Sequence, residues 1–406
     1  MSGVTALSPT LSPSGRGRQA FLSNLGLVCS LGDGVASVRE GLFATAPSGV
    51  KTTDFFSADR PLALGRVEAA VPSLAHVALE FRSRNNALLS LALAQLRPAV
   101  DAAISRFGPD RVGVVLGTST SGIGEAELAI DAQVKGGAFT DGYHYTQQEL
   151  ASPARFLAAT LGTRGPTSVI STACSSSAKA LASAARWLDA GLVDVVIAGG
   201  ADSLCRFTIA GFSALESVSA ARCNPMSRNR NGINIGEAAA IFLVTCDEGP
   251  VRLAGWGETS DAHHLSSPEP TGKGAAEAMR LALGRAQLQA SEVGYLNLHG
   301  TATPQNDAME SRAVQTVLGL GVPASSTKPL TGHTLGAAGA LEAALVWLTL
   351  TDEAGRLPPH WFDGERDPEL PELRLVEPGQ RAQIRAALSN SFAFGGSNAT
   401  LALVRS

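Results

Sequence analysis

A cysteine stands where the sequence predicts a turn between a strand and a helix. Cys174 follows the β-branched run 168–171, and the Ser- and Ala-rich segment 175–190 after it is predicted to be helical. Such a turn exposes its side chain, and the free N–H groups at the start of a helix favour a thiolate and can bind an oxyanion. A nucleophile for covalent catalysis and a small buried cysteine both fit this position taken alone.

Two histidines lie in segments rich in glycine and other small residues. His299 follows a predicted strand in Asn-Leu-His-Gly-Thr-Ala-Thr-Pro, and His333 lies in the segment 328–339, which begins with Lys328. A single histidine at such a place is more often structural than catalytic, but Lys328 can bring positive charge to the same pocket. The loop 391–398 adds two aromatic residues among small ones. The four features together indicate a catalytic site, although none of them does so alone.

Short apolar runs that alternate with helical segments must position these residues. The predicted strands are the runs 112–116, 168–171, 194–198, 240–245, 293–298, 386–389 and 400–404. This alternation predicts an α/β architecture, and runs that are apolar on both faces predict strands covered by helices on each side. Thr-Ala-Cys at 172–174 and Thr-Gly-His at 331–333 each precede a predicted helix, which hints at two related halves.

The charged turn at 247–250 is the predicted seam between these halves. Residues 21–249 form the first half, with the cysteine, and residues 250–406 form the second half, with both histidines. Residues 1–20 are expected to be a flexible leader. A length of 406 residues fits two domains or two closely packed halves.

Composition excludes several classes of protein. The 32 basic and 36 acidic residues give a net charge of −4, which argues against a protein that coats nucleic acid or binds membranes through a polybasic surface. The five cysteines form no CxxC pair and no zinc-type spacing, and an odd number argues against a disulfide framework. The stretch 331–351 is long enough to span a bilayer, but its histidine, glutamate and glycines favour a buried helix. We therefore expect a cytoplasmic protein without a membrane span.

The motifs in this order resemble those of the β-ketoacyl-acyl carrier protein synthases of the elongating type. The resemblance rests on Thr-Ala-Cys at 172–174, His-Gly-Thr at 299–301 and Lys-x-x-x-Gly-His-x-x-Gly-Ala-Ala-Gly at 328–339, and it extends from residue 22 to the C-terminus. It implies a thiolase-like fold, a five-layered αβαβα sandwich of two similar halves, expected as a homodimer, with a heterodimer with a related ketosynthase subunit as the alternative. It also implies a decarboxylating Claisen condensation on acyl carrier protein thioesters, which requires no redox cofactor and no catalytic metal.

The resemblance assigns roles residue by residue. Cys174 matches the nucleophile, His299 and His333 the two active-site histidines, and Lys328 the lysine that supports the second histidine, His333. The residues matched to the substrate pocket and gate are Phe394, Phe207 and Ala393. Those matched to supporting positions are Glu342, Thr301, Thr303 and Asp307. A monovalent cation site is implied at Asn297, Glu342, Ser389 and Asn390, and carrier-protein docking at Arg82, Arg84 and Arg206.

Several departures from the family pattern narrow the prediction. Ala393 replaces the first glycine of a Gly-Phe-Gly-Gly loop, and its methyl group is expected to stiffen the gate. The segments 175–179 and 220–230 and the leader differ from those of housekeeping fatty acid enzymes, which favours a specialised pathway such as polyene or type II polyketide synthesis.

Two alternatives to an elongating synthase stay open at this point. One is a non-catalytic chain-length factor within a ketosynthase heterodimer, a class that typically lacks the nucleophile present here as Cys174. The other is a thiolase or initiating enzyme that acts on coenzyme A esters, and His333 argues against it.

Overall fold

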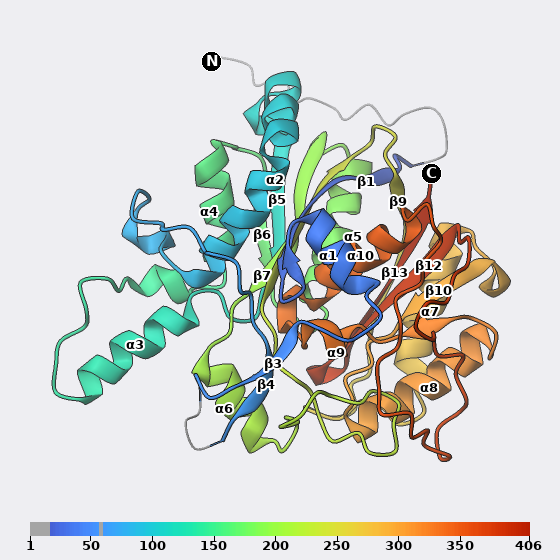
Figure 1. The fold of residues 1–406 in the computed structure, drawn as a ribbon. Coiled ribbons are helices and arrows are strands. Elements are labelled where there is room, and N and C mark those ends of the chain that lie inside the picture. Colours follow the sequence, from blue (N-terminus) through green and yellow to red (C-terminus); the bar gives the residue numbers. More distant parts are fainter. Residues whose placement is uncertain (1–16, 57–59) are drawn as a thin grey trace.

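A continuous sheet of 11 strands runs through the computed structural model, which describes residues 17–56 and 60–406 (Figure 1). Its strand order is β11-β10-β12-β13-β9-β1-β8-β7-β5-β6, with β2 paired to β1 at the side. The strands are β1 (Ala20–Cys29), β2 (Gly32–Asp33), β5 (Val112–Gly117), β6 (Thr167–Ile170), β7 (Val195–Asp202), β8 (Ala238–Thr245), β9 (Val251–Ser260), β10 (Val293–Asn297), β11 (Ala324–Ser325), β12 (Ala386–Ala393) and β13 (Ser397–Arg405).

The two ends of this sheet repeat one pairing pattern. In the first half, β1–β8 and β8–β7 are antiparallel, and β7–β5 and β5–β6 are parallel. In the second half, β9–β13 and β13–β12 are antiparallel, and β12–β10 and β10–β11 are parallel. The five-strand sets meet where residues 20–22 of β1 pair with residues 251–253 of β9. The hint of two related halves in the sequence is therefore seen in the topology, and the turn 247–250 lies between β8 and β9.

Helices cover both faces of each five-strand set and make five layers. Helices α5 and α10 pack against each other between the two sets, α2 and α4 cover the outer face of the first, and α7 and α8 cover that of the second (Figure 1). Their bounds are α2 (Arg84–Phe107), α4 (Ser152–Leu161), α5 (Ser176–Asp189), α7 (Lys273–Ala286), α8 (Pro304–Leu318) and α10 (Ala338–Leu350). The order of layers, αβαβα, confirms the predicted fold class.

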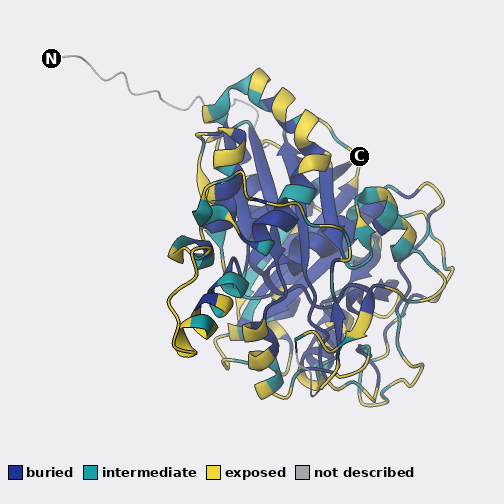
Figure 2. Ribbon diagram, turned by 60° about the vertical axis from the view of Figure 1, so that its left-hand side comes forward, coloured by how far each residue is buried: buried dark blue, intermediate teal, exposed yellow. Residues whose placement is uncertain are grey.

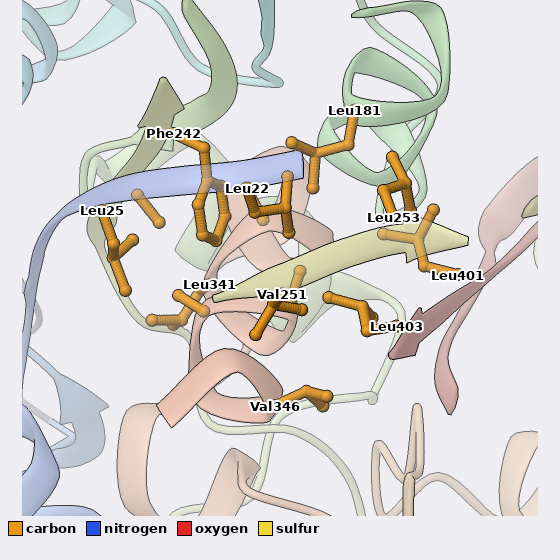
Figure 3. Packing of buried hydrophobic residues seen from close by; sticks show 14 of the residues in the cluster. Leu22, Leu25, Leu181, Phe242, Val251, Leu253, Leu341, Val346, Leu401 and Leu403 are labelled. Atoms are coloured by element: carbon orange, nitrogen blue, oxygen red, sulfur yellow. The ribbon is translucent and has the colours of Figure 1, made fainter. Parts of the chain in front are cut away.

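Burial follows from this layering. Every residue of β5, β7 and β8 is buried, as expected for strands whose two faces both meet helices (Figure 2). Helix α10 is buried nearly all round, so the apolar stretch 331–351 is a core segment. Around it, Leu22 and Phe242 of the first half meet Leu253 and Leu401 of the second in one apolar cluster (Figure 3). The central helices thus join the halves into one core.

Helix α2 is, in the described part of the chain, the one helix long and apolar enough to cross a bilayer by length and composition. It has 24 residues and packs against β1 and β8. Its Leu88, Leu89 and Leu96 are fully buried there. Burial against the sheet accounts for its apolar composition.

The remaining elements lie around the five layers. They are α1 (Val35–Leu42), β3 (Val50–Thr53), β4 (Leu62–Gly65), α3 (Ile123–Val134), α6 (Arg206–Ala214) and α9 (Lys328–Thr331), with several 3-10 turns. Residues 1–16 of the expected leader lie outside the described residues, and the first strand begins at Ala20.

Small residues permit the close approach of α5 and α10. A Cβ at Gly339 of α10 would lie 2.6 Å from the backbone N and 2.7 Å from the Cβ of Ala178 on α5. We expect Gly339→Ala to lower the free energy of unfolding by about 2 kcal/mol through overpacking. Urea denaturation measures this. Gly284→Ala on α7, where a Cβ meets nothing within 4 Å, is the matched control and should be neutral or slightly stabilising. Equal effects of the two substitutions would contradict this packing.

Candidate active site

Cys174 lies on a strained turn that opens helix α5. Strand β6 ends at Ile170, Ala173 has a φ of 51°, and the helix begins at Ser176. The Ser176 hydroxyl accepts the N–H of Thr172 at 2.8 Å and so closes the turn. A non-glycine residue with positive φ next to a nucleophile stores strain that presents the side chain. The predicted strand-to-helix elbow is present.

Two histidines face this thiol from the second half of the chain. His299 follows β10, and His333 follows α9, where its N–H donates to the carbonyl oxygen of Asn234 at 2.6 Å. The Cys174 sulfur lies 3.0 Å from Nε2 of His333. The two imidazole rings are 5.3 Å apart and nearly perpendicular. The structure therefore brings together the three residues that the sequence placed in separate motifs.

A buried lysine contacts His299 and fixes its tautomer, whereas the sequence resemblance assigned this lysine to the second histidine, His333. Lys328 is 2% exposed, and its ammonium donates to Oε1 of Glu342 and to the carbonyl oxygen of His299. The same Nζ lies 3.4 Å from Nδ1 of His299. An ammonium can only donate, so Nδ1 accepts and the proton of the neutral ring resides on Nε2. A ring protonated at Nε2 has no lone pair there for a metal, which argues against a zinc site at this Cys-His-His set.

Burial and charge keep the three reactive groups neutral. Burial, reinforced by the positive charge of Lys328, holds the pKa of His299 and of His333 well below the usual value. Burial raises the pKa of Cys174 to about 12, against the opposing effects of Lys328 and of the backbone N–H groups of Phe394 and Cys174. The resting pair is thus a thiol beside a neutral imidazole. The thiolate expected from the helix terminus forms only when the thiol proton moves to His333.

The site opens into a cavity of about 320 Å³. Its wall combines the reactive residues with aromatic and hydroxyl side chains, namely Cys174, His299, His333, Phe212, Phe392, Phe394, Thr301 and Thr303. The Phe394 ring lies 5.7 Å from that of Phe212. The hydroxyls of Thr301 and Thr303 are hydrogen-bonded to each other at 2.9 Å, and both residues line the cavity.

The gate loop differs from the sequence-based expectation in its backbone. Ala393 lines the cavity, but its backbone is extended, with φ −100° and ψ 155°, which any residue adopts. Its methyl group therefore imposes no backbone strain in this conformation, contrary to the expected stiffening. The positive φ values belong to Gly395 and Gly396, at 80° and 73°, so the freedom of the loop lies after Phe394.

The sequence-based prediction that Phe207 lines the substrate pocket is wrong. It is 65% exposed and lies outside the cavity wall. Phe212 occupies the wall instead, on the same helix α6. Five residues along a helix turn the side chain by roughly 140°, so the two phenylalanines point to different sides. The sequence identified the correct helix and the wrong face.

Two buried carboxylates support the turn that carries His299. Asp307 accepts the N–H groups of Ala302 and of Met226, as a supporting residue should. Glu310, which the sequence analysis missed, accepts the N–H of His299 at 2.8 Å. Burial raises the pKa of Glu310 to about 7. The i, i+3 spacing of these two acids on α8 was the available signal, since it places both on one helix face.

The residues implied for a monovalent cation are only partly free to bind one. Asn297 Oδ1, Ser389 Oγ and Glu342 Oε2 are buried without a hydrogen-bond partner in the described chain. Asn297 and Ser389 are also register partners on β10 and β12. The side chain of Asn390 is engaged elsewhere, since it donates to Glu310 and its oxygen accepts from Thr400. Three of the four predicted side chains therefore have an oxygen that is free to coordinate a cation.

The arginines predicted to dock a carrier protein are not equally available. Arg84 forms two hydrogen bonds to Glu237, whose side chain is fully buried, so its charge is already paired. Arg82 is exposed but donates to the carbonyl oxygens of Val77 and Ala75. Arg206 is exposed and forms no ion pair with any of the described residues, 17–56 and 60–406. The prediction is wrong for Arg84, which is a structural residue.

The geometry and fold define a thiol acyltransferase with two supporting histidines, and comparison with known proteins gives the family. Residues 88–248 match the model of the β-ketoacyl synthase N-terminal domain, and residues 251–361 match that of the C-terminal domain. The chain belongs to the β-ketoacyl synthase family. It is a ketosynthase with Cys174, His299 and His333 in place, which favours the catalytic role over that of a chain-length factor.

Relatives extend this similarity over nearly the whole chain. The 3-oxoacyl-[acyl-carrier-protein] synthase 2 of Staphylococcus aureus is 30% identical over 80% of this chain and 86% of its own. That of Synechocystis is 28% identical over 95% and 97%. A solved complex of a ketosynthase with its chain length factor, from Xenorhabdus doucetiae, contains a chain that is 43% identical, with a TM-score of 0.92 over 96% of this chain and 98% of that one.

The pairing of Arg84 generates a prediction about stability. Arg84→Met leaves the carboxylate of Glu237 buried and unpaired, and we expect it to lower the free energy of unfolding by about 3 kcal/mol. Chemical denaturation measures the change. Arg97→Met on the same helix removes only an exposed pair with Asp101 and should cost less than about 0.5 kcal/mol. A stable Arg84→Met protein would return Arg84 to the set of docking candidates.

Proposed function

We propose that this ketosynthase performs a decarboxylating condensation of an acyl group held on Cys174 with a malonyl group on an acyl carrier protein. One observation carries the proposal: the thiol meets a neutral His333 at 3.0 Å while Lys328 keeps the proton of His299 on Nε2. That arrangement supplies a base for the nucleophile and a hydrogen-bond donor for a developing enolate in one cavity.

The first half-reaction is acyl transfer. The Cys174 sulfur attacks the carbonyl carbon of an acyl thioester, and its proton passes to Nε2 of His333. The N–H groups of Cys174 and Phe394, whose interactions with the sulfur lower the pKa of the thiol, are placed to bind the oxyanion. When the tetrahedral intermediate collapses, the carrier-protein thiolate leaves and takes the proton back from His333. The result is acyl-Cys174 and a neutral imidazole.

The second half-reaction forms the carbon–carbon bond. The malonyl carboxylate leaves as CO2, and its electron pair becomes an enolate whose oxygen receives hydrogen bonds from His299 and His333. The enolate carbon attacks the carbonyl of acyl-Cys174, and the carbon–sulfur bond breaks. The sulfur is released as a thiolate and takes up one proton from solvent, which restores the thiol. For this step the neutral ring of His333 must exchange its proton with water in the cavity so that Nε2 carries it. Nδ1 of His333 has no hydrogen-bond partner in the described chain, so no contact there holds the ring in the opposite tautomer.

Separating the half-reactions tests these roles. We expect His299→Ala to slow malonyl decarboxylation by roughly 10²–10³, because it removes one donor to the enolate oxygen, and to slow acyl loading far less. Loading is followed by intact-mass spectrometry and decarboxylation by CO2 release. His76→Ala, at an exposed histidine, is the control. Normal decarboxylation by the His299→Ala protein would contradict the assignment.

The same assay tests whether Cys174 is the nucleophile. Cys174→Ala should take up no acyl group and still decarboxylate malonyl carrier protein, because both histidines stay in place. Cys246→Ala, which changes the most exposed of the five cysteines, should load as the wild type does. Acyl capture by the Cys174→Ala protein would place the nucleophile elsewhere.

A second ketosynthase-type subunit is the proposed protein partner besides the carrier protein. Strand β6 pairs with β5 alone in the part of the chain that the structure describes, and its Thr167 and Ser168 are exposed. Helix α3 presents Leu128, Ile130 and Val134 to solvent. An open strand edge and exposed apolar residues are each features that a subunit interface covers. The 43% identity to a chain of a solved complex between a ketosynthase and its chain length factor supports a heterodimer more than a homodimer.

A monovalent cation is the proposed occupant of the oxygen-rich site at Asn297, Ser389 and Glu342. Their unpartnered oxygens are the support for this proposal. The cation would supply positive charge beside the Glu342 carboxylate and would hold β10 against β12. It would take no part in proton transfer, which the histidines and Cys174 carry out.

A further inference from the structure

The two oxyanion donors of this site come from distant parts of the chain. The N–H of Cys174 belongs to the turn before α5, and that of Phe394 belongs to the hairpin between β12 and β13. No local backbone geometry fixes the distance between them. Since oxyanion stabilisation depends on both donors reaching one oxygen, something must hold the hairpin against the turn.

Side chains next to both donors provide that connection. Ser175 follows Cys174, and Ser397 is the first residue of β13, just beyond Phe394. Their hydroxyl oxygens lie 3.1 Å apart. Lys179, one turn further along α5, donates from Nζ to the same Ser397 oxygen at 2.6 Å. The Ser397 hydroxyl therefore bridges the gate hairpin and the helix of the nucleophile.

The donor and acceptor roles in this bridge follow from its two ends. The Lys179 ammonium can only donate, and the carbonyl oxygen of Thr172, which accepts from Ser175 Oγ at 2.8 Å, can only accept. Ser175 has used its proton on that carbonyl, so it accepts the proton of Ser397. The chain of hydrogen bonds runs from Lys179 through Ser397 and Ser175 to Thr172. Each hydroxyl has one orientation, and such directional chains reinforce themselves.

Lys179 has no other evident task. It is partly buried, and its ammonium meets no carboxylate within residues 17–56 and 60–406, whereas Arg186 on the same helix pairs with Glu258. Burial, with a smaller effect of Arg186, lowers the pKa of Lys179. Partial burial of an ammonium against a single neutral hydroxyl costs free energy of folding. That cost points to a role for the contact between Lys179 and Ser397.

We propose that Lys179 is a positioning residue that, through Ser397 and Ser175, holds the N–H groups of Phe394 and Cys174 in register for the oxyanion. The proposal rests on the condensing function argued above. This role predicts different effects on two reactions of the Cys174 thiol. Acyl transfer from a thioester passes through an oxyanion and needs both donors, whereas alkylation by iodoacetamide forms none.

The test compares these two reactions in Lys179→Met. Loss of a whole oxyanion donor slows reaction by roughly 10²–10³, so a displaced donor is expected to slow acyl loading about tenfold. Alkylation of Cys174 by iodoacetamide should stay at the wild-type rate. Ser397→Ala should show the same split, the double variant should add no further loss, and Lys179→Arg should recover part of the loading rate. Lys273→Met, at an exposed lysine, is the matched control.

Three results would overturn the proposal. Loading at the wild-type rate in Lys179→Met would show that the bridge does not position the donors. Equal losses of loading and alkylation, with a lower midpoint of thermal unfolding, would show that Lys179 only supports the fold. Independent losses in Lys179→Met and Ser397→Ala that add in the double variant would show that the two residues do not act together. Failure of the wild type itself to load an acyl group would instead remove the proposed function, which is a distinguishable outcome.

Discussion

The active site depends on the ion pair between the buried ammonium of Lys328 and the carboxylate of Glu342. A charge removed from water is costly unless it is paired, and Glu342 provides the pairing carboxylate. The same ammonium fixes the tautomer of His299 and, with burial, keeps both histidines neutral. Neutral imidazoles are what this chemistry needs, because one must accept the thiol proton and one must donate to an enolate. Burial and this one salt bridge together set the protonation of the two histidines.

The duplicated fold explains how the thiol reaches these groups. Lys328, Glu342 and His299 all belong to the second half, and Cys174 belongs to the first. The halves meet through α5 and α10, where Gly339 permits close contact and the Ser177 hydroxyl accepts the N–H of Ala340 at 2.8 Å. The central layer is therefore part of the catalytic apparatus, since its packing sets the distance between sulfur and imidazole.

Much of this site could be predicted from the sequence because its key residues lie in local motifs. Cys174 and His333 each occupy a short turn with recognisable small residues, and the alternation of strands and helices indicates the layers. The errors concern contacts between distant segments. The pairing of Arg84 with Glu237 spans much of the first half, and the orientation of Phe207 depends on how α6 packs. Glu310 was missed because its role appears only when α8 lies against the turn of His299.

The central claim is that one cavity couples loss of CO2 to carbon–carbon bond formation. The most direct test supplies acyl-loaded protein with malonyl carrier protein labelled in its free carboxyl carbon. The product on the carrier and the labelled CO2 are then measured in a single turnover by mass spectrometry. The account predicts a β-ketoacyl product extended by the acetyl unit, with one labelled CO2 released for each product formed. Release of labelled CO2 with only acetyl carrier protein formed, while the acyl group stays on Cys174, would contradict it.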